Sequence, residues 1–99
     1  MRDERFEWHG PKAASNFRKH GVTFDAARAV FDDVHHVEEF DDDWYDDGDH
    51  DGDHDGDRWV RIGLSDGHVL VVGYTERGRR VRIISAREAN PDEQERYFK

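Results

Sequence analysis

The sequence predicts an α+β domain with two N-terminal helices, an antiparallel sheet of three or four strands and a short C-terminal helix. Apolar residues recur at helical spacing before residue 32, and apolar and polar residues alternate in runs after residue 58. A capping signature then precedes the last turns of the chain. We therefore expect one domain over residues 1–99, with its helices packed on one face of the sheet.

Two helices are expected before residue 35. Pro11 suits the first turn of a helix because its missing N–H needs no partner there, and Gly21 suits the left-handed residue that ends this helix. Thr23 can cap a second helix, with Asp25 near its positive end. One face of the second helix is apolar and carries Phe24, Ala27, Val30 and Phe31.

Strands dominate the second half of the expected fold. Asp66-Gly67 is a strong signal for a hairpin turn, and a second turn is expected at residues 77–79. Asn90 and Glu93 have the spacing of a capping box that begins a terminal helix. The expected strands cover residues 37–40, 58–65, 69–75 and 81–86.

The formal net charge of -9 comes from one segment. Residues 41–57 hold ten Asp and no Lys or Arg, and the rest of the chain has 15 basic and 14 acidic side chains. Asp and Gly disfavour strand and adjacent carboxylates repel, so we expect a mobile, solvated insert. The absence of Cys excludes disulfides and thiol chemistry. No apolar run is long enough to span a membrane, and we expect a cytoplasmic protein.

The acidic segment resembles the start of a calcium-binding loop. Its Asp-x-Asp-x-Asp-Gly pattern begins at Asp47 and again at Asp51. An EF-hand loop needs a bidentate Glu at its twelfth position, but Arg58 and Ile62 stand there. We therefore expect no metal site and no cofactor. Metal binding by this Asp/His-rich loop stays as an alternative function.

A stripe of five arginines with one glutamate lies between residues 74 and 87. Arg binds phosphate through two parallel N–H donors and stays charged, so the stripe predicts a polyanion or an acidic partner. An ordinary solvated sheet face is an equal alternative. We expect Arg61 beside the stripe across the sheet, and Tyr74 and Tyr97 can stack on bases. The stripe comprises Arg77, Arg79, Arg80, Arg82 and Arg87.

Lys19 and His20 end the first expected helix. His can move a proton near neutral pH, and a neighbouring Lys can hold a phosphate. Both residues also complement the negative end of the helix dipole, which is the simpler interpretation. Glycine-rich phosphate loops, His-Glu-x-x-His and Gly-x-Ser-x-Gly are absent from the sequence.

Several blocks taken together resemble the BrnT family of bacterial toxins. The resemblance covers about residues 6–98 apart from the acidic insert. The usual Asp after the tryptophan is His9 here, and the link before the first long strand is expanded and acidic. The blocks are Phe6-Glu7-Trp8, Lys12, Asn16, Lys19-His20-Gly21-Val22-Thr23-Phe24, Ala27, Val30-Phe31-Asp32-Asp33, Arg58-Trp59-Val60-Arg61-Ile62-Gly63, Val71-Val72-Gly73-Tyr74-Thr75-Glu76-Arg77, Arg82-Ile83-Ile84-Ser85-Ala86-Arg87-Glu88-Ala89, Glu95 and Tyr97.

The resemblance implies a RelE-like α+β fold and a ribonuclease that arrests translation and growth. It also implies a BrnA-type antitoxin whose ribbon-helix-helix part binds operator DNA, and we expect the two proteins to form a heterotetramer. The leading hypothesis is a metal-independent endoribonuclease with RNA as its substrate. The alternative from another class is a non-catalytic module that binds an acidic partner through the same arginines.

Metal-independent RNA cleavage needs a base for the 2′-hydroxyl, cations for the phosphorane and an acid for the leaving 5′-oxygen. We expect His20 to be the base or the acid, and Glu76 to position an arginine or share the proton transfer. The cations expected at the reacting phosphate are Lys19, Arg61, Arg77 and Arg87. Further RNA contacts are expected from Lys12, Tyr74, Arg80, Arg82 and Tyr97.

Overall fold

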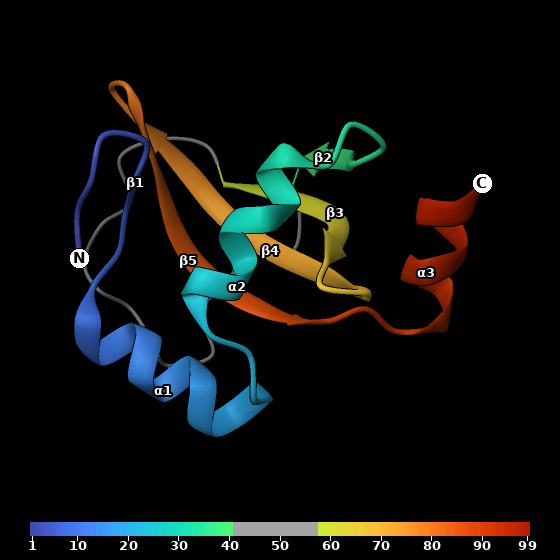
Figure 1. Ribbon diagram of the computed structural model, residues 1–99, viewed down its shortest axis with the longest axis horizontal. Coiled ribbons are helices and arrows are strands. Elements are labelled where there is room, and N and C mark those ends of the chain that lie inside the picture. The colour runs from blue at the N-terminus through green and yellow to red at the C-terminus, as the bar shows by residue number, and fades with distance from the viewer. Residues whose placement is uncertain (41–57) are drawn as a thin grey trace.

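The computed structural model describes residues 1–40 and 58–99, and the insert expected at 41–57 lies outside the described residues. The described part contains a five-stranded sheet with the order β1-β5-β4-β3-β2 (Figure 1). Its strands are β1 (Phe6–Glu7), β2 (Val37–Phe40), β3 (Trp59–Ser65), β4 (His68–Arg77) and β5 (Arg80–Glu88). The helical elements are α1 (Gly10–His20), α2 (Phe24–Arg28), the 3-10 turn η1 (Ala29–Asp32) and α3 (Pro91–Phe98).

The expected helix caps are confirmed. Gly21 has a φ of 70° and ends α1, while the Thr23 side chain accepts a hydrogen bond from the Ala26 N–H at the start of α2. Asn90 and Glu93 form the capping box of α3. Each of these signals is contained within a few residues, which is why the sequence reveals it.

The second helix is shorter than its apolar pattern predicts. It ends at Arg28, and the chain tightens into η1, which keeps Val30 fully buried. A Cβ at Gly63 of β3 would lie 2.9 Å from the Val30 side chain. Close packing of η1 on β3 is therefore possible only because position 63 has no side chain.

The sheet differs from the expected three or four antiparallel strands. The central hairpins are antiparallel, and the predicted Asp66-Gly67 turn is confirmed by φ angles of 51° and 82°. The fifth strand, β1, pairs parallel with β5 through Phe6 opposite Val81 and Glu7 opposite Arg82. Two residues are too few to show a periodicity, so the sequence gives no strand signal there.

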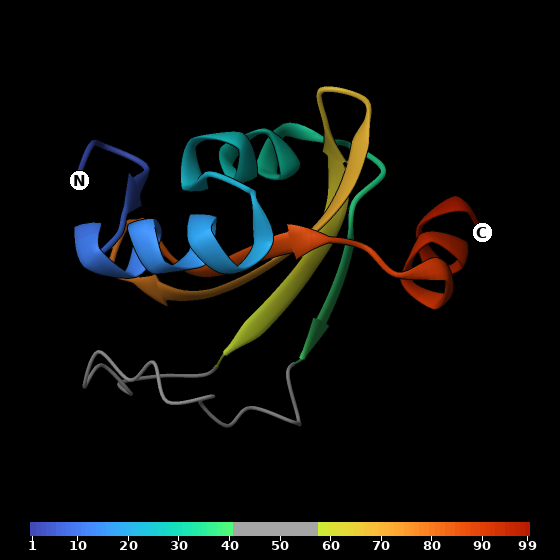
Figure 2. The ribbon, with the colours of Figure 1, turned by 90° about the horizontal axis from the view of Figure 1, so that it is seen from below.

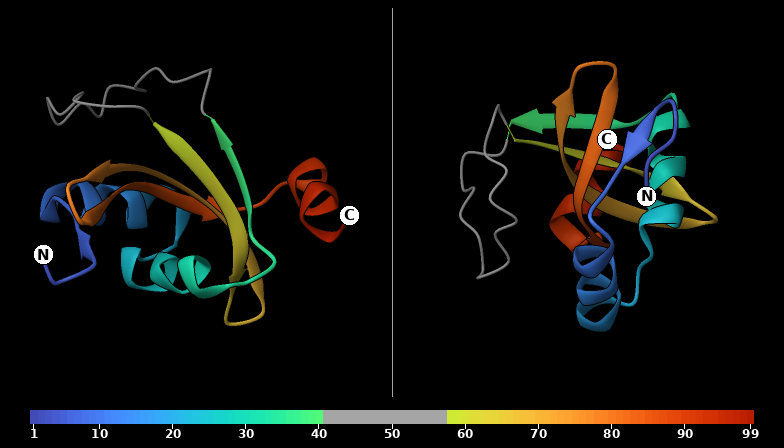
Figure 3. Two further views of the ribbon diagram at one scale, coloured as in Figure 1. Left: turned by 90° about the horizontal axis from the view of Figure 1, so that it is seen from above. Right: turned by 90° about the vertical axis from the view of Figure 1, so that its left-hand side faces the viewer.

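The two faces of the sheet are covered by different helices. On the first face, α1, α2 and η1 cover an apolar cluster that includes Phe24, Val72 and Ile83 (Figures 2 and 3). On the second face, α3 packs Tyr97 against Ile62 and Val71 at one end of the sheet. The expectation that all helices share one face is thus wrong for α3. The rest of the second face carries no described helix (Figure 2).

Candidate functional site

A polar cluster of Arg61, Tyr74 and Glu38 lies at the rim of the first face. Arg61 donates to Glu38 Oε2 at 2.9 Å and to the Tyr74 hydroxyl at 3.4 Å, and Tyr74 donates to the same carboxylate oxygen. The Arg61 guanidinium carbon lies 4.7 Å from the centre of the Phe31 ring and 5.4 Å from that of Tyr74. One carboxylate and two aromatic rings therefore fix this arginine in place.

The electrostatics of this cluster favour a structural role for Glu38 and Tyr74. Hydrogen bonds from Tyr74 and Arg61 hold the pKa of the Glu38 carboxyl below its usual value, so Glu38 stays ionised. Burial, together with Glu38, raises the pKa of the Tyr74 hydroxyl. The Tyr74 residue is only 2% exposed. Neither group is poised to exchange a proton near neutral pH, and the Tyr74 ring is not available for stacking on a base.

Arginines also lie on the second face, on the part that α3 leaves uncovered. Arg82 of β5 pairs with Glu7 of β1 at 3.0 Å, and both side chains are mostly buried. Thr75 is opposite Arg82 in the sheet, so alternation along β4 places Arg77 on this face too. Arg58, just before β3, also lies on this face. Its guanidinium is close to the point where a Cβ at Gly73 would lie.

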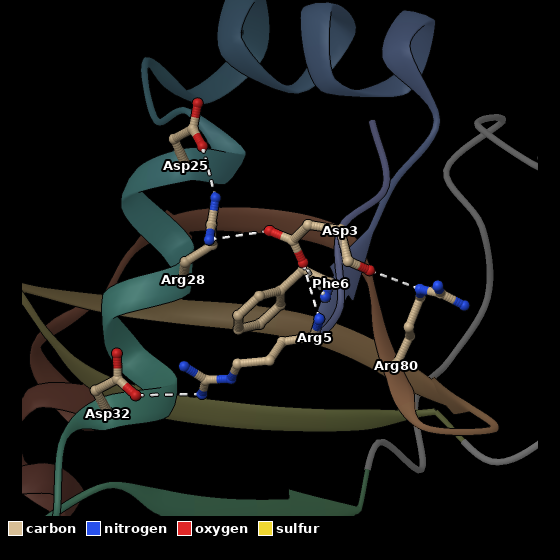
Figure 4. Close-up of polar contacts among 7 residues, drawn as sticks. All are labelled: Asp3, Arg5, Phe6, Asp25, Arg28, Asp32 and Arg80. Atoms are coloured by element: carbon tan, nitrogen blue, oxygen red, sulfur yellow. Dashed lines mark hydrogen bonds and ion pairs between the residues drawn. The ribbon is translucent and has the colours of Figure 1, made fainter.

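The turn between β4 and β5 adds two further cations to this end of the sheet. Its residues line a surface hollow of about 550 Å³ together with Glu4. Arg80 is held in place because its Nε donates to the main-chain oxygen of Asp3 at 2.6 Å (Figure 4). The lining residues from the turn are Arg77, Gly78, Arg79 and Arg80.

Asp3 organises the N-terminal segment next to this turn, as Figure 4 shows. Its Oδ1 accepts hydrogen bonds from the N–H groups of Phe6 and Arg5 at 2.7 Å and 2.9 Å, and these bonds lower the pKa of the Asp3 carboxyl. Its Oδ2 lies 3.0 Å from Arg28 of α2, and Arg5 pairs with Asp32 at 3.2 Å. These contacts tie residues 1–5 to α2, η1 and β5.

Two of the expected site residues instead hold α3 to the sheet. Arg87 donates two hydrogen bonds of 2.7 Å to the Glu93 carboxylate, and these bonds lower the pKa of Glu93. The Tyr97 hydroxyl donates to Asp33 Oδ2 at 2.5 Å, and the Tyr97 residue is 8% exposed. In this structure, both residues connect α3 to its neighbours.

Lys19 and His20 are exposed at the end of α1, far from the arginines of the β4–β5 turn. The next residue, Gly21, lines a hollow of about 230 Å³ together with Leu70 of β4. Arg77 lies seven residues farther along this strand, which is about 23 Å at the usual rise of a β-strand. The structure therefore does not bring His20 and Arg77 to one phosphate.

The comparison with protein families decides the assignment. The model for the BrnT ribonuclease toxin of type II toxin–antitoxin systems matches residues 8–93. The chain belongs to the BrnT family. It is thus a ribonuclease toxin of a type II toxin–antitoxin system, with RNA as its target and an antitoxin as its partner. No curated protein matches the chain.

For this BrnT-family chain, the structure divides the expected site residues into four groups. Arg77, Arg80 and Arg82 gather at the end of the sheet that holds the β4–β5 turn. Arg61 and Tyr74 lie on the first face, and alternation places Glu76 there as well. Arg87 and Tyr97 hold α3, and Lys12, Lys19 and His20 lie on α1.

Sequence reasoning missed three polar residues beside these groups in the BrnT-family fold. Glu38 binds Arg61, Glu7 binds Arg82, and Arg58 approaches Gly73. A glycine inside an apolar strand indicates that another group approaches the backbone closely. Gly73 is such a glycine, and it is the signal in the sequence that could have pointed to Arg58. No comparable signal marks Glu7 or Glu38, because their partners are set by strand pairing across the sheet.

Residues 1–40 and 58–99 contain no group of three or more His, Cys, Asp or Glu side chains that could hold a metal ion. In the same ranges, no helix is both long and apolar enough to cross a membrane.

Proposed function

We propose that this chain cleaves RNA internally and without a metal ion, on the second face of its sheet. The observation that carries the proposal is the placement of Arg58, Arg77 and Arg82 on or beside three neighbouring strands, on the part of this face that α3 leaves uncovered. A guanidinium group can bind a phosphate through two parallel N–H···O hydrogen bonds, and it stays charged at every physiological pH. Such a surface suits a phosphodiester substrate.

In the proposed reaction, the ribose 2′-oxygen attacks phosphorus, the bond from phosphorus to the 5′-oxygen breaks, and a 2′,3′-cyclic phosphate forms. Arg77 and Arg82 stabilise the additional negative charge of the phosphorane. Glu7, 3.0 Å from Arg82, is the carboxylate proposed to accept the 2′-hydroxyl proton. The leaving 5′-oxygen takes its proton from water.

Residues on α1 are outside this catalytic group. Arg18, Lys19 and His20 form the last turn of α1, where positive charge complements the helix dipole. Gly21, the residue after His20, lines a hollow with Leu70, and Leu70 and Arg77 are separated by about 23 Å along β4. We therefore assign the proton transfer to the second face and a supporting electrostatic role to the end of α1.

Membership of the BrnT family supports the biological setting that we propose. The partner is a BrnA-type antitoxin with a ribbon-helix-helix part, which binds operator DNA and forms a heterotetramer with the toxin. The toxin acts as one RelE-like domain in the cytoplasm, where its RNA target is. Expression of the chain alone in bacteria then stops growth, and co-expression of the antitoxin restores it.

The test is cleavage of a defined RNA by the purified chain in EDTA. The proposal predicts products with 2′,3′-cyclic phosphate and 5′-hydroxyl ends, and no cleavage where the attacking 2′-oxygen is methylated. Cleavage that disappears in EDTA and returns with Mg²⁺ would contradict metal independence. Binding of RNA without any cleavage would support the non-catalytic alternative.

A further inference from the structure

Gly73 creates an unusual close approach on the second face. A Cβ at this position would lie 2.6 Å from the Ser85 hydroxyl oxygen, and 3.5 Å and 3.7 Å from Nη2 and Nε of Arg58. A Cβ essentially never comes within 3.0 Å of a heavy atom outside its own residue and that residue's chain neighbours. The missing side chain therefore lets the hydroxyl and the guanidinium lie side by side over β4.

The two groups over Gly73, a hydroxyl and a guanidinium, are both hydrogen-bond donors. Ser85 is half-buried on β5 opposite Gly73, and within residues 1–40 and 58–99 no hydrogen bond of its hydroxyl is found. Arg58 is half-buried beside it and carries a permanent positive charge. A neutral O–H donor beside a guanidinium matches the needs of a phosphate, which accepts several hydrogen bonds and favours a cation.

We propose that Gly73, Ser85 and Arg58 form a phosphate-binding cradle that holds one phosphate of the RNA backbone. Gly73 is its floor, and Ser85 and Arg58 donate to the phosphate oxygens. Arg82 lies three residues before Ser85 on β5, so the cradle adjoins the Arg82–Glu7 pair. The proposal rests on the second face being the RNA-binding face. In it, Ser85 and Arg58 position the RNA strand through one of its phosphates.

The experiment measures binding of a short 2′-O-methyl RNA that cannot be cleaved, with inorganic phosphate as a second probe. Ser85→Ala is expected to weaken RNA binding about tenfold, because one hydrogen bond to a charged group is lost. Arg58→Gln is expected to weaken it at least as much and to reduce the slope of log affinity against log salt by about 0.7, the value for one phosphate contact on a single strand.

Ser65→Ala and Arg96→Gln are the matched controls. Ser65 donates to the Ala26 carbonyl on the first face, and Arg96 pairs with Glu39 at α3. Neither control is expected to change RNA affinity by more than about twofold, although Ser65→Ala lowers the melting temperature. The controls separate a loss of binding from a loss of stability.

Gly73→Ala is the steric variant. It drives the Ser85 hydroxyl out of position and is expected to weaken RNA binding about as much as Ser85→Ala does. If Gly73→Ala does not fold, the affinities of Ser85→Ala and Arg58→Gln still test whether the cradle binds RNA, because each of these substitutions removes polar atoms without adding bulk.

The outcomes distinguish the cradle from the proposed ribonuclease mechanism. Affinities for the uncleavable RNA within twofold of the parent in both Ser85→Ala and Arg58→Gln would overturn the cradle, whatever the parent cleaves. A parent chain that binds through the cradle and leaves cleavable RNA intact in EDTA would overturn the ribonuclease mechanism and leave the cradle standing.

Discussion

Replacing Arg87 separates a structural from a catalytic role. In Arg87→Ala, the Glu93 carboxylate loses both of its 2.7 Å hydrogen bonds and keeps the one from the Asn90 N–H. The Glu93 side chain is 12% exposed and that of Arg87 is 40% exposed, so the pair is intermediate between a surface and a buried ion pair. We expect a cost of about 2 kcal/mol, between the ~1 kcal/mol of exposed pairs and the ~3–5 kcal/mol of buried ones.

For a chain of this length, that cost lowers the melting temperature by about 10 °C. The assay is thermal unfolding followed by circular dichroism, together with RNA cleavage per folded molecule at a temperature where the variant is native. Arg96→Ala is the control, since Arg96 and Glu39 are more exposed, and it is expected to cost less than about 1 kcal/mol. An Arg87→Ala chain that keeps its melting temperature and loses cleavage would refute the structural role.

Two further predictions concern packing and pH. Gly63→Ala is expected to destabilise the fold by about 1–3 kcal/mol in denaturant titration, because its Cβ would lie 2.9 Å from the Val30 side chain and 3.3 Å from the Val30 carbonyl oxygen. The control is Gly10→Ala, because Gly10 has open space around it. Equal denaturation midpoints for the two variants would contradict the packing argument. The pKa values of Glu38 and Glu93 are lowered in the folded state, so their stabilisation is complete above the ordinary value of 4.5 and is lost as the pH falls below it. Glu38→Gln should therefore lower stability at pH 7 and flatten the acid limb of melting temperature against pH, and an acid limb as steep as that of the parent would count against this origin.

Local signals in the sequence predicted most of the elements. Gly21, Thr23 and the Asn90–Glu93 capping box act through hydrogen bonds between residues close in the chain, so their spacing alone identifies them. The Asp66-Gly67 turn is equally local, because it needs two residues that tolerate positive φ. Features of this kind can be predicted from the sequence without any knowledge of the tertiary structure.

Long-range pairing decided what the sequence did not reveal. β1 is recognisable only through its partner, since Glu7 and Arg82 are 75 residues apart in the chain. Arg61 and Arg82 were expected on one surface, but Arg61 contacts Phe31 on the first face while Arg82 lies on the second. Which face a strand residue occupies depends on register, and the irregularity at Gly73/Tyr74 shifts that register.

Site assignment from composition met the same difficulty. The five arginines between residues 74 and 87 read as one stripe, yet Arg87 forms a bidentate pair that fastens α3. His20 and Lys19 matched the chemistry of RNA cleavage, but α1 ends at the opposite end of β4 from Arg77. Residue type indicates which chemistry is possible, and only the fold determines which groups meet.

The central claim is that the arginines of the second face carry RNA cleavage, and one comparison tests it most directly. The rate of RNA cleavage in EDTA is measured for the parent, Arg82→Ala and Arg96→Ala, each checked for an intact fold by its melting temperature. The account predicts that Arg82→Ala lowers the rate by about 100-fold or more, the effect of losing one group that stabilises the transition state, while Arg96→Ala cleaves at the parent rate. A folded Arg82→Ala chain that cleaves as fast as the parent would contradict it.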